Sequence, residues 1–256
     1  MASYATFTLL VLAGFLASAF SSSSPARIED YPSTVQLETG IGRVWLQTCV
    51  GSVLTSRHVL TAAHCLIGTA LTPRISRVRA GTSERGRGGD VWEVNSVIRH
   101  PDYSLKAFEG NVGIVRLQTA LWFGAAIQQA RITASGVAFP ANVPVTLAGW
   151  GRTSQEDLWA DRDLHSTQLY TVDHSLCVEK YGDLKVPIAV TENMICAATL
   201  GTTGANFGVR DGGSPVFYDG ILVGFVSFGS PLSATEYPLV ATAVSPYSDW
   251  IVENAV

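Results

Sequence analysis

One histidine in this chain has neighbours that would suit acid–base chemistry. His64 lies at the end of an apolar run that leads into a short turn and a cysteine, Val59-Leu60-Thr61-Ala62-Ala63-His64-Cys65. An imidazole can take up and release a proton close to neutral pH, as a general base must. A lone histidine is more often a satisfied structural group, so its setting has to decide. A second cysteine, in Cys49-Val50-Gly51-Ser52, stands about fifteen residues earlier.

The chain has four cysteines, and two chemical uses compete for them. They could form two disulfides, with three possible pairings that spacing alone does not distinguish. They could instead bind zinc, but the sequence has no CxxC motif, and only His64 of the five histidines adjoins a cysteine. We therefore expect two disulfides, no metal site and no cofactor. The cysteines are Cys49, Cys65, Cys177 and Cys196.

The N-terminal residues differ from the rest of the chain. An apolar run from Phe7 to Phe20 contains Ala17-Ser18-Ala19, a small-residue pattern typical of signal-peptide cleavage. The run is too short to span a bilayer as a helix, which takes about 20 residues. Met1-Ala2-Ser3-Tyr4 lacks a basic residue, so a buried N-terminal helix is the alternative. We predict a signal peptide over residues 1–19, secretion into an extracellular, oxidising compartment, and a soluble mature chain.

Composition predicts a folded protein without a nucleic-acid partner. The 256 residues are 47% hydrophobic and 15% charged, which is enough to bury a core in one or two domains. The formal net charge of −4 leaves no basic stripe to neutralise phosphates. Nothing in the charge balance indicates a membrane surface.

Short β-branched runs separated by Gly, Pro, Ser and Asp predict mostly strands. Val91–Ile98 and Pro144–Ala148 are examples, and an Asp219-Gly220 pair between apolar runs predicts a tight hairpin. Two helices are expected, Asp173–Lys180 with Asp173 as N-cap and Ser245–Glu253 with Ser245 as N-cap. The fold class is therefore all-β, a barrel or sandwich with a C-terminal helix.

Several motifs together resemble the trypsin/chymotrypsin-like (S1) family of serine proteases, particularly trypsin-like proteins of insects such as moths. The motif Thr61–Cys65 carries the resemblance most specifically, and the whole similar region runs from about Tyr31 to the C-terminus. It implies two six-stranded antiparallel β-barrels over residues 31–256, a site between them, disulfides Cys49–Cys65 and Cys177–Cys196, and a monomer. The other matching motifs are Arg99–Tyr103, Ala148–Gly151, Asn193–Cys196, Asp211, Pro215, Ser227–Gly229 and Asp249–Ile251.

The resemblance also exposes departures at the residues that carry the family's reaction. That reaction needs a hydroxyl nucleophile, an imidazole and a carboxylate that orients the imidazole. In ungapped register, Arg210-Asp211-Gly212-Gly213-Ser214-Pro215 places Gly212 at the nucleophile position, and Asn111 stands at the position of the carboxylate. Of the three catalytic positions, His64 alone is retained. Ser214 lies about 6–7 Å along the chain from Gly212 if the segment is extended, too far to replace a nucleophile without rebuilding the loop.

The positions that would bind substrate depart as well. Gly208 and Leu232 replace a cysteine pair that braces the specificity pocket in the family. Leu239 is expected to fill the pocket, and Arg210 to crowd the oxyanion hole. The substrate-binding positions implied by the resemblance are Asn206, Arg210, Ser227, Gly229 and Leu239.

The activation region is altered too. Family members are cut before an Ile-Val-Gly-Gly start, whereas Arg27-Ile28 is followed here by Glu29-Asp30-Tyr31. We expect residues 20–30 to be a short pro-segment or N-terminal segment. Asp211, the internal acid that pairs with the new N-terminal amine in relatives, is expected to lack that partner. The loop at Glu84 lacks the acidic cluster that binds calcium in some relatives, so no calcium ion is expected there.

Two hypotheses follow from these departures. The first is a secreted, non-catalytic homologue that binds a peptide, a protease or a protease inhibitor. The alternative is a serine-type endopeptidase with an atypical active site, which acts on polypeptide substrates.

Overall fold

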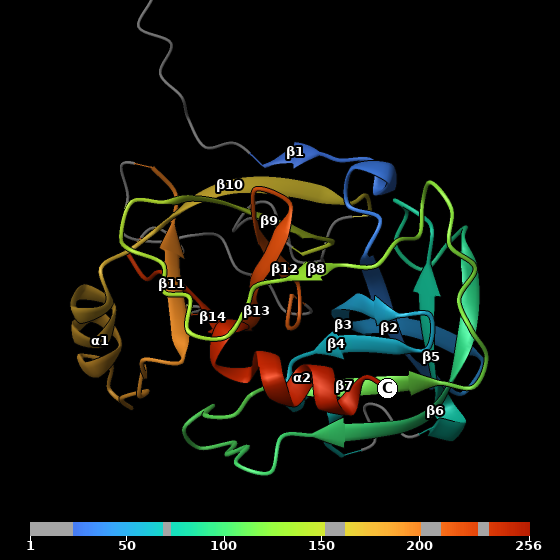
Figure 1. The fold of residues 1–256 in the computed structure, drawn as a ribbon, viewed down its shortest axis with the longest axis horizontal. Helices are drawn as coiled ribbons and strands as arrows, with labels where there is room; N and C mark the ends of the chain where they lie inside the picture. Colours follow the sequence, from blue (N-terminus) through green and yellow to red (C-terminus); the bar gives the residue numbers. More distant parts are fainter. Residues whose placement is uncertain (1–22, 69–72, 152–161, 201–210, 230–235) are drawn as a thin grey trace, which may run out of the picture.

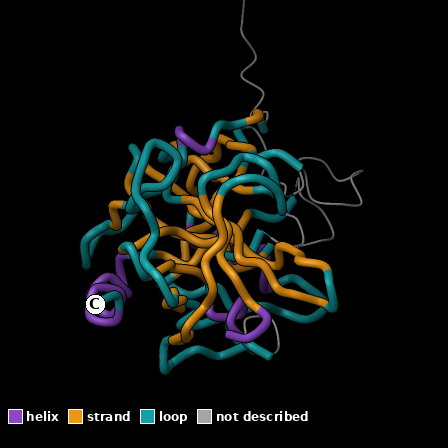
Figure 2. Tube along the Cα trace, turned by 90° about the vertical axis from the view of Figure 1, so that its right-hand side faces the viewer, coloured by secondary structure: helices purple, strands orange, loops and turns teal. Residues whose placement is uncertain are grey.

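The structure is a computed structural model that describes residues 23–68, 73–151, 162–200, 211–229 and 236–256. It contains two β-barrels packed side by side, with the strands at the centre of the molecule and the loops around them (Figures 1 and 2). Both barrels have six antiparallel strands, which confirms the predicted fold class.

The first barrel is a closed ring of strands between residues 34 and 117. Its pattern of burial shows why these segments form strands: in β6, Trp92 and Val94 are buried while Val91, Glu93 and Asn95 are exposed. This period of two directs one face of the strand into the barrel. The ring runs β2 (Thr34–Ile41), β3 (Val44–Thr55), β4 (His58–Thr61), β7 (Gly113–Leu117), β6 (Asp90–Arg99) and β5 (Ser76–Ala80).

The second barrel closes because β9 pairs with both β10 and β12. Asp219 and Gly220 have φ angles of 48° and 70°, as predicted for the tight turn between β12 and β13. Two short strands, β1 (Ser24–Pro25) and β8 (Arg131–Ile132), add to β10 and β13. The ring runs β9 (Pro144–Gly149), β10 (His165–Thr171), β11 (Met194–Ala198), β14 (Leu239–Ala243), β13 (Ile221–Phe228) and β12 (Pro215–Tyr218).

Two α-helices complete the fold, and one begins later than predicted. Helix α1 (His174–Gly182) has the predicted N-cap, because the Asp173 carboxylate accepts from Ser175 N at 2.9 Å and Leu176 N at 3.3 Å. The prediction that Ser245 caps a continuous helix is wrong. Residues Ser245–Tyr247 form a 3₁₀ turn, η4, whose N-cap is Val244, and α2 (Ser248–Asn254) follows it.

Packing explains the altered start of the C-terminal helix. The backbone N–H of Tyr247 donates to the Val244 carbonyl at 2.9 Å, a tight i to i+3 bond. The Ser248 hydroxyl donates at 2.6 Å to the carbonyl of Thr133. Ile251 is buried in the same cluster as Val115 of β7, so α2 covers the first barrel although the chain reaches it from the second (Figure 1).

The N-terminal segment is held by backbone bonds and by burial. Pro25 pairs with His165 of β10, and Ala26 N donates to the Leu164 carbonyl at 2.8 Å. Ile28 is 4% exposed and packs with Val50, Trp150 and Leu164. It opens a 3₁₀ turn, η1 (Ile28–Asp30), and its N–H donates to Ser83 Oγ at 2.9 Å.

Within the residues that the structure describes, no helix is both long and apolar enough to cross a membrane.

Candidate functional site

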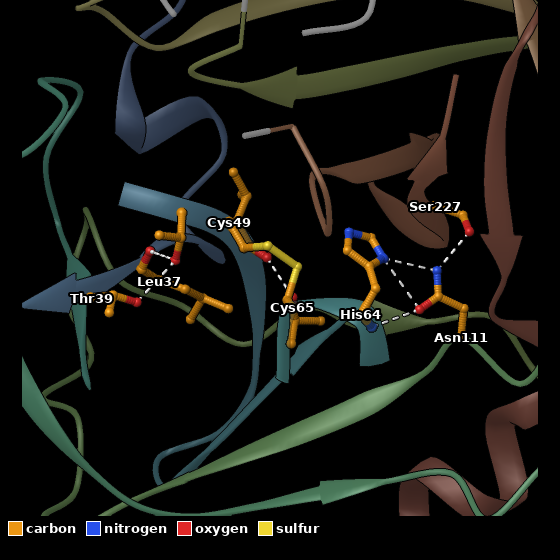
Figure 3. Close-up of a disulfide and its surroundings, with 10 residues drawn as sticks. Leu37, Thr39, Cys49, His64, Cys65, Asn111 and Ser227 are labelled. Atoms are coloured by element: carbon orange, nitrogen blue, oxygen red, sulfur yellow. Dashed lines mark hydrogen bonds between the residues drawn. A yellow bond between two sulfur atoms is a disulfide. The ribbon is translucent and has the colours of Figure 1, made fainter. Parts of the chain in front are cut away.

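His64 lies between the two barrels, on a short helical turn that follows β4. This turn, η2 (Ala63–Leu66), is tied to β3 by the disulfide Cys49–Cys65. The second disulfide joins Cys177 of α1 to Cys196 of β11, so both predicted pairings are confirmed. The disulfide beside His64 fixes the turn, and the imidazole projects from it toward the second barrel (Figure 3).

Asn111, just before β7, contacts the imidazole from one side. Its Oδ1 accepts from the backbone N–H of His64 at 2.9 Å. Because that N–H can only donate, it determines which way the side-chain amide points. The opposite Nδ2 then donates to Ser227 Oγ on β13 at 2.6 Å, which links the two barrels (Figure 3).

The orientation of this amide decides which nitrogen of His64 carries the proton. Asn111 Nδ2 lies 3.0 Å from His64 Nδ1, whereas Oδ1 lies 3.3 Å from it and already accepts a backbone bond. The nearer group is a donor, so Nδ1 acts as the acceptor and the ring proton lies on Nε2. A nucleophile would need the other tautomer, in which Nε2 is free to accept its proton.

The imidazole is neutral near pH 7. Burial lowers the pKa of His64, because the charged form would lose its hydration. The ring also lies 6.3 Å, centroid to centroid, from Phe108, edge to face.

Gly212 faces the other side of the same ring. A Cβ atom built on Gly212 would overlap His64 Nε2 and would lie 3.1 Å from Cε1 and 3.3 Å from Cys65 Sγ. The imidazole therefore occupies the space that a side chain at position 212 would need. Neither a hydroxyl nor a methyl group fits there unless the ring moves.

The backbone around Gly212 is nevertheless firmly held by both barrels. Gly212 accepts from Val50 N at 2.9 Å, and Gly213 N donates to the Val226 carbonyl at 2.8 Å. Gly213 has φ of 81°, and a Cβ there would overlap the Val50 carbonyl, so this position requires glycine. The turn keeps its shape although position 212 has no side chain.

The Ser214 hydroxyl lies against Gly149 and forms no hydrogen bond with the imidazole. It is completely buried, and a Cβ built on Gly149 would lie 2.6 Å from its Oγ. Among the described residues, no hydroxyl forms a hydrogen bond with the ring of His64, whose side-chain partner is Asn111. The neighbouring Asp211 is buried with its carboxylate against Gly151, where any side chain would overlap it.

The predicted substrate-binding residues are only partly visible. Leu239 is 1% exposed and packs in an apolar cluster with Ala197 and Val226. Ser227 lies at the end of β13 beside Asn111, and Gly229 follows that strand. The other pocket positions, Asn206, Gly208, Arg210 and Leu232, lie outside the described residues.

Sequence reasoning missed the residues that position Asn111. Glu109, two residues before it, accepts from three side chains: Thr191 Oγ1 at 2.6 Å, Asn193 Nδ2 at 2.7 Å and Tyr247 OH at 3.0 Å. Burial tends to raise the pKa of Glu109, but these bonds and the Gly110 N–H together lower it. An acid two positions before Asn111 was the only signal in the sequence.

Phe108 was also missed. Its ring lies 4.9 Å from that of Phe228, so the two aromatic side chains form a wall beside His64. Phe108 has a positive φ of 51°, unusual for an aromatic residue, so tertiary packing determines its conformation.

One group of three potential metal ligands occurs in the described part of the chain. Cys49, Cys65 and His64 have ligand atoms within 4.8 Å of one another. Both sulfur atoms are consumed in the disulfide, so thiolates are not available and this group does not form a metal site as it stands.

Comparisons with known proteins identify the family. The family model described as "Trypsin" matches residues 21–251. The alkaline trypsin C of Manduca sexta is 32% identical, with 97% of this chain and 99% of that protein aligned. Trypsin CFT-1 of Choristoneura fumiferana is 31% identical, with 91% and 89% aligned. The predicted resemblance to insect trypsin-like proteins is confirmed.

Solved structures show the same fold at lower identity. The scabies mite inactivated protease paralogue S-D1 superposes with a TM-score of 0.80 at 22% identity, covering 92% of this chain and 98% of that one. Mouse neuropsin, a serine protease, gives a TM-score of 0.77 at 22% identity, covering 91% and 99%.

Proposed function

The chain belongs to the trypsin family of serine proteases, and we propose that it is a non-catalytic member that acts by binding a polypeptide. The bound partner would be a peptide, a protease or a protease inhibitor. One observation carries the proposal: the imidazole of His64 fills the space where the nucleophile's side chain would stand, and position 212 is glycine. Without a hydroxyl beside the ring, no acyl intermediate can form.

The tautomer of His64 supports the same conclusion. With the proton on Nε2, the ring can donate a hydrogen bond into the crevice but cannot deprotonate an attacking group. A water molecule in place of the nucleophile would meet the same obstacle. Asn111 and Gly212, the two positions that depart from the catalytic triad, therefore both argue against catalysis.

Export completes the proposal. We propose that residues 1–19 are a signal peptide, residues 20–30 a short N-terminal segment that stays attached, and residues 31–256 an extracellular, monomeric binding domain. The apolar run Phe7–Phe20 and the two disulfides support this assignment.

A fluorophosphonate probe for nucleophilic serines tests the loss of catalysis. We expect no adduct on the purified protein before or after treatment with trypsin, while active trypsin labels fully under the same conditions. Stoichiometric labelling at Ser214 or at any other serine would refute the proposal. The competing function, an atypical endopeptidase, requires peptide turnover that the exchange His64→Ala abolishes.

Binding is tested separately from catalysis. An immobilised protein inhibitor of trypsin is the first probe, because its reactive loop is shaped for a crevice of this fold. We expect retention of the protein, and equal retention of His64→Ala, since no reaction is needed. Failure of both proteins to bind this inhibitor and a panel of trypsin-like proteases would contradict the binding role.

A further inference from the structure

A hollow of about 380 Å³ lies apart from the His64 site. Four segments that are distant in the sequence form it: residues 30–33, residues 129–131, Thr146 of β9, and the β12–β13 turn with Phe217. This volume is at the lower end of the range for small-molecule sites, about 300–1,000 Å³. None of the residues around it belongs to the triad positions, so it is separate from the crevice discussed above.

Two aromatic rings provide an apolar surface in this hollow. Tyr31 and Phe217 both line it, with ring centroids 6.0 Å apart and planes inclined by 32°. Phe217 is 8% exposed and belongs to the main hydrophobic core, so its position is fixed from below. An aliphatic chain, or a cation above a ring face, would be stabilised here.

Three charged side chains line the same hollow: Arg131, Asp30 and Asp219. In the part of the chain that the structure describes, no ion pair joins any of them to a partner. The buried acid Glu38 differs, because it is paired with Arg77 and Arg79 at 2.5 and 2.8 Å. The three groups around the hollow keep their full capacity for a ligand.

The position of Arg131 agrees with this view. One of its terminal nitrogens would lie 3.5 Å from a Cβ built on Gly220, so the guanidinium extends across the β12–β13 turn. It lies near Asp219 in the fold but makes no ion pair with it, and it offers a planar set of donors that suits a carboxylate.

From these features we propose that the hollow binds a free basic amino acid such as arginine or lysine. The hollow offers one guanidinium and two carboxylates, and a basic amino acid carries one carboxylate, an α-ammonium group and a side-chain cation, so the charges are complementary. The carboxylate of the ligand binds Arg131, its two cationic groups bind Asp30 and Asp219, and its aliphatic chain packs on Tyr31 and Phe217.

Calorimetric titration with three small molecules tests the proposal. The probes are L-arginine, agmatine, which lacks the carboxylate, and L-norleucine, which lacks the side-chain cation. We expect saturable binding of arginine with a dissociation constant in the millimolar range or below, and weaker binding of norleucine. The absence of saturable arginine binding up to about 10 mM would overturn the proposal.

Two variants assign the charges. Arg131→Gln should weaken arginine binding about three- to tenfold while leaving agmatine binding unchanged or tighter. Asp219→Asn should weaken both ligands, and it preserves the turn because asparagine tolerates a positive φ. Arg43→Gln, an exposed arginine outside the hollow, is the matched control and should bind as the wild type does.

The ratio of the two affinities makes the test specific. If Arg131→Gln weakens arginine and agmatine equally, or neither, Arg131 does not bind a carboxylate and the proposal fails. These measurements involve no catalysis and no inhibitor, so their outcome is independent of the proposed function.

Discussion

Restoring both lost groups should recover serine reactivity far better than restoring the nucleophile alone. The perturbation is the pair Gly212→Ser and Asn111→Asp, compared with Gly212→Ser by itself. In the single variant, the new side chain meets the imidazole, because a Cβ at position 212 would overlap His64 Nε2. Crowding of this kind costs about 1–3 kcal/mol of folding free energy, and the ring would still carry its proton on Nε2.

The second exchange corrects the tautomer. An aspartate at position 111 would keep one oxygen on the backbone N–H of His64, now 2.9 Å away, and place the other where Nδ2 lies, 3.0 Å from Nδ1. Nδ1 would then have to donate, and Nε2 would become the base. In an active serine protease the reverse exchange lowers turnover by about 10⁴, which corresponds to about 5.4 kcal/mol of transition-state stabilisation. We therefore expect the double variant to react up to about 10⁴-fold faster than the single variant.

The rate of labelling by a fluorophosphonate is the appropriate assay, because it does not depend on the substrate pocket. Mass spectrometry should place the adduct at position 212, and adding His64→Ala to the double variant should abolish it. Ser214→Ala in the same background is the matched control and should change nothing. Equal labelling rates for the single and double variants would refute the argument from the tautomer.

Three further outcomes follow from the contacts described above. Glu109→Gln should reduce the free energy of unfolding by about 1–3 kcal/mol, because its side-chain bonds hold the loop before Asn111. Since the folded pKa of Glu109 is lowered, its stabilisation is complete above the unfolded pKa and is lost as pH falls through the folded value; melting temperatures from pH 7 to 3 should converge for the two proteins at the acid end. Burial likewise lowers the folded pKa of His64, so the unfolded chain takes up a proton at this residue before the folded protein does. Stability should therefore fall as pH drops from 7 toward 5, and His64→Gln should reduce this dependence of the melting temperature on pH. Trypsin should leave Arg27–Ile28 uncut in the folded protein while it cuts at exposed basic residues such as Lys106, because Ile28 is buried and hydrogen-bonded to Ser83; N-terminal sequencing of early fragments would reveal this.

Features encoded by neighbouring residues were predictable from the sequence. The Asp219-Gly220 turn needs two positive φ angles that the pair supplies, and Asp173 caps α1 through N–H groups two and three residues away. Family resemblance supplied the rest of the fold, including the two disulfide pairings. Ser245 was misassigned because the decisive bond, Ser248 Oγ to the Thr133 carbonyl, crosses 115 residues.

Features that depend on distant residues could not be predicted in the same way. The sequence shows glycine at position 212, but it does not reveal that the imidazole of His64 fills the space that a side chain there would need. The amide of Asn111 is oriented by contacts 47 and 116 residues away, and Glu109 is bonded to two other segments, residues 191–193 and Tyr247. Such contacts form only when the barrels close, and the pattern of neighbouring residues in the sequence does not predict them.

The two departures at the site reinforce each other physically. With serine at position 212, the imidazole could not occupy its present place, and Asn111 would hold it in an unproductive tautomer. With glycine, the imidazole can occupy the place that a Cβ would overlap, and the asparagine amide is satisfied on both sides, by His64 N and by Ser227 Oγ. The side chain of Asn111 is therefore fully hydrogen-bonded in the arrangement that glycine at position 212 allows. If the proposed loss of catalysis is correct, reversing one exchange alone would disturb that arrangement without rebuilding the triad, so we expect serine reactivity to require both exchanges together.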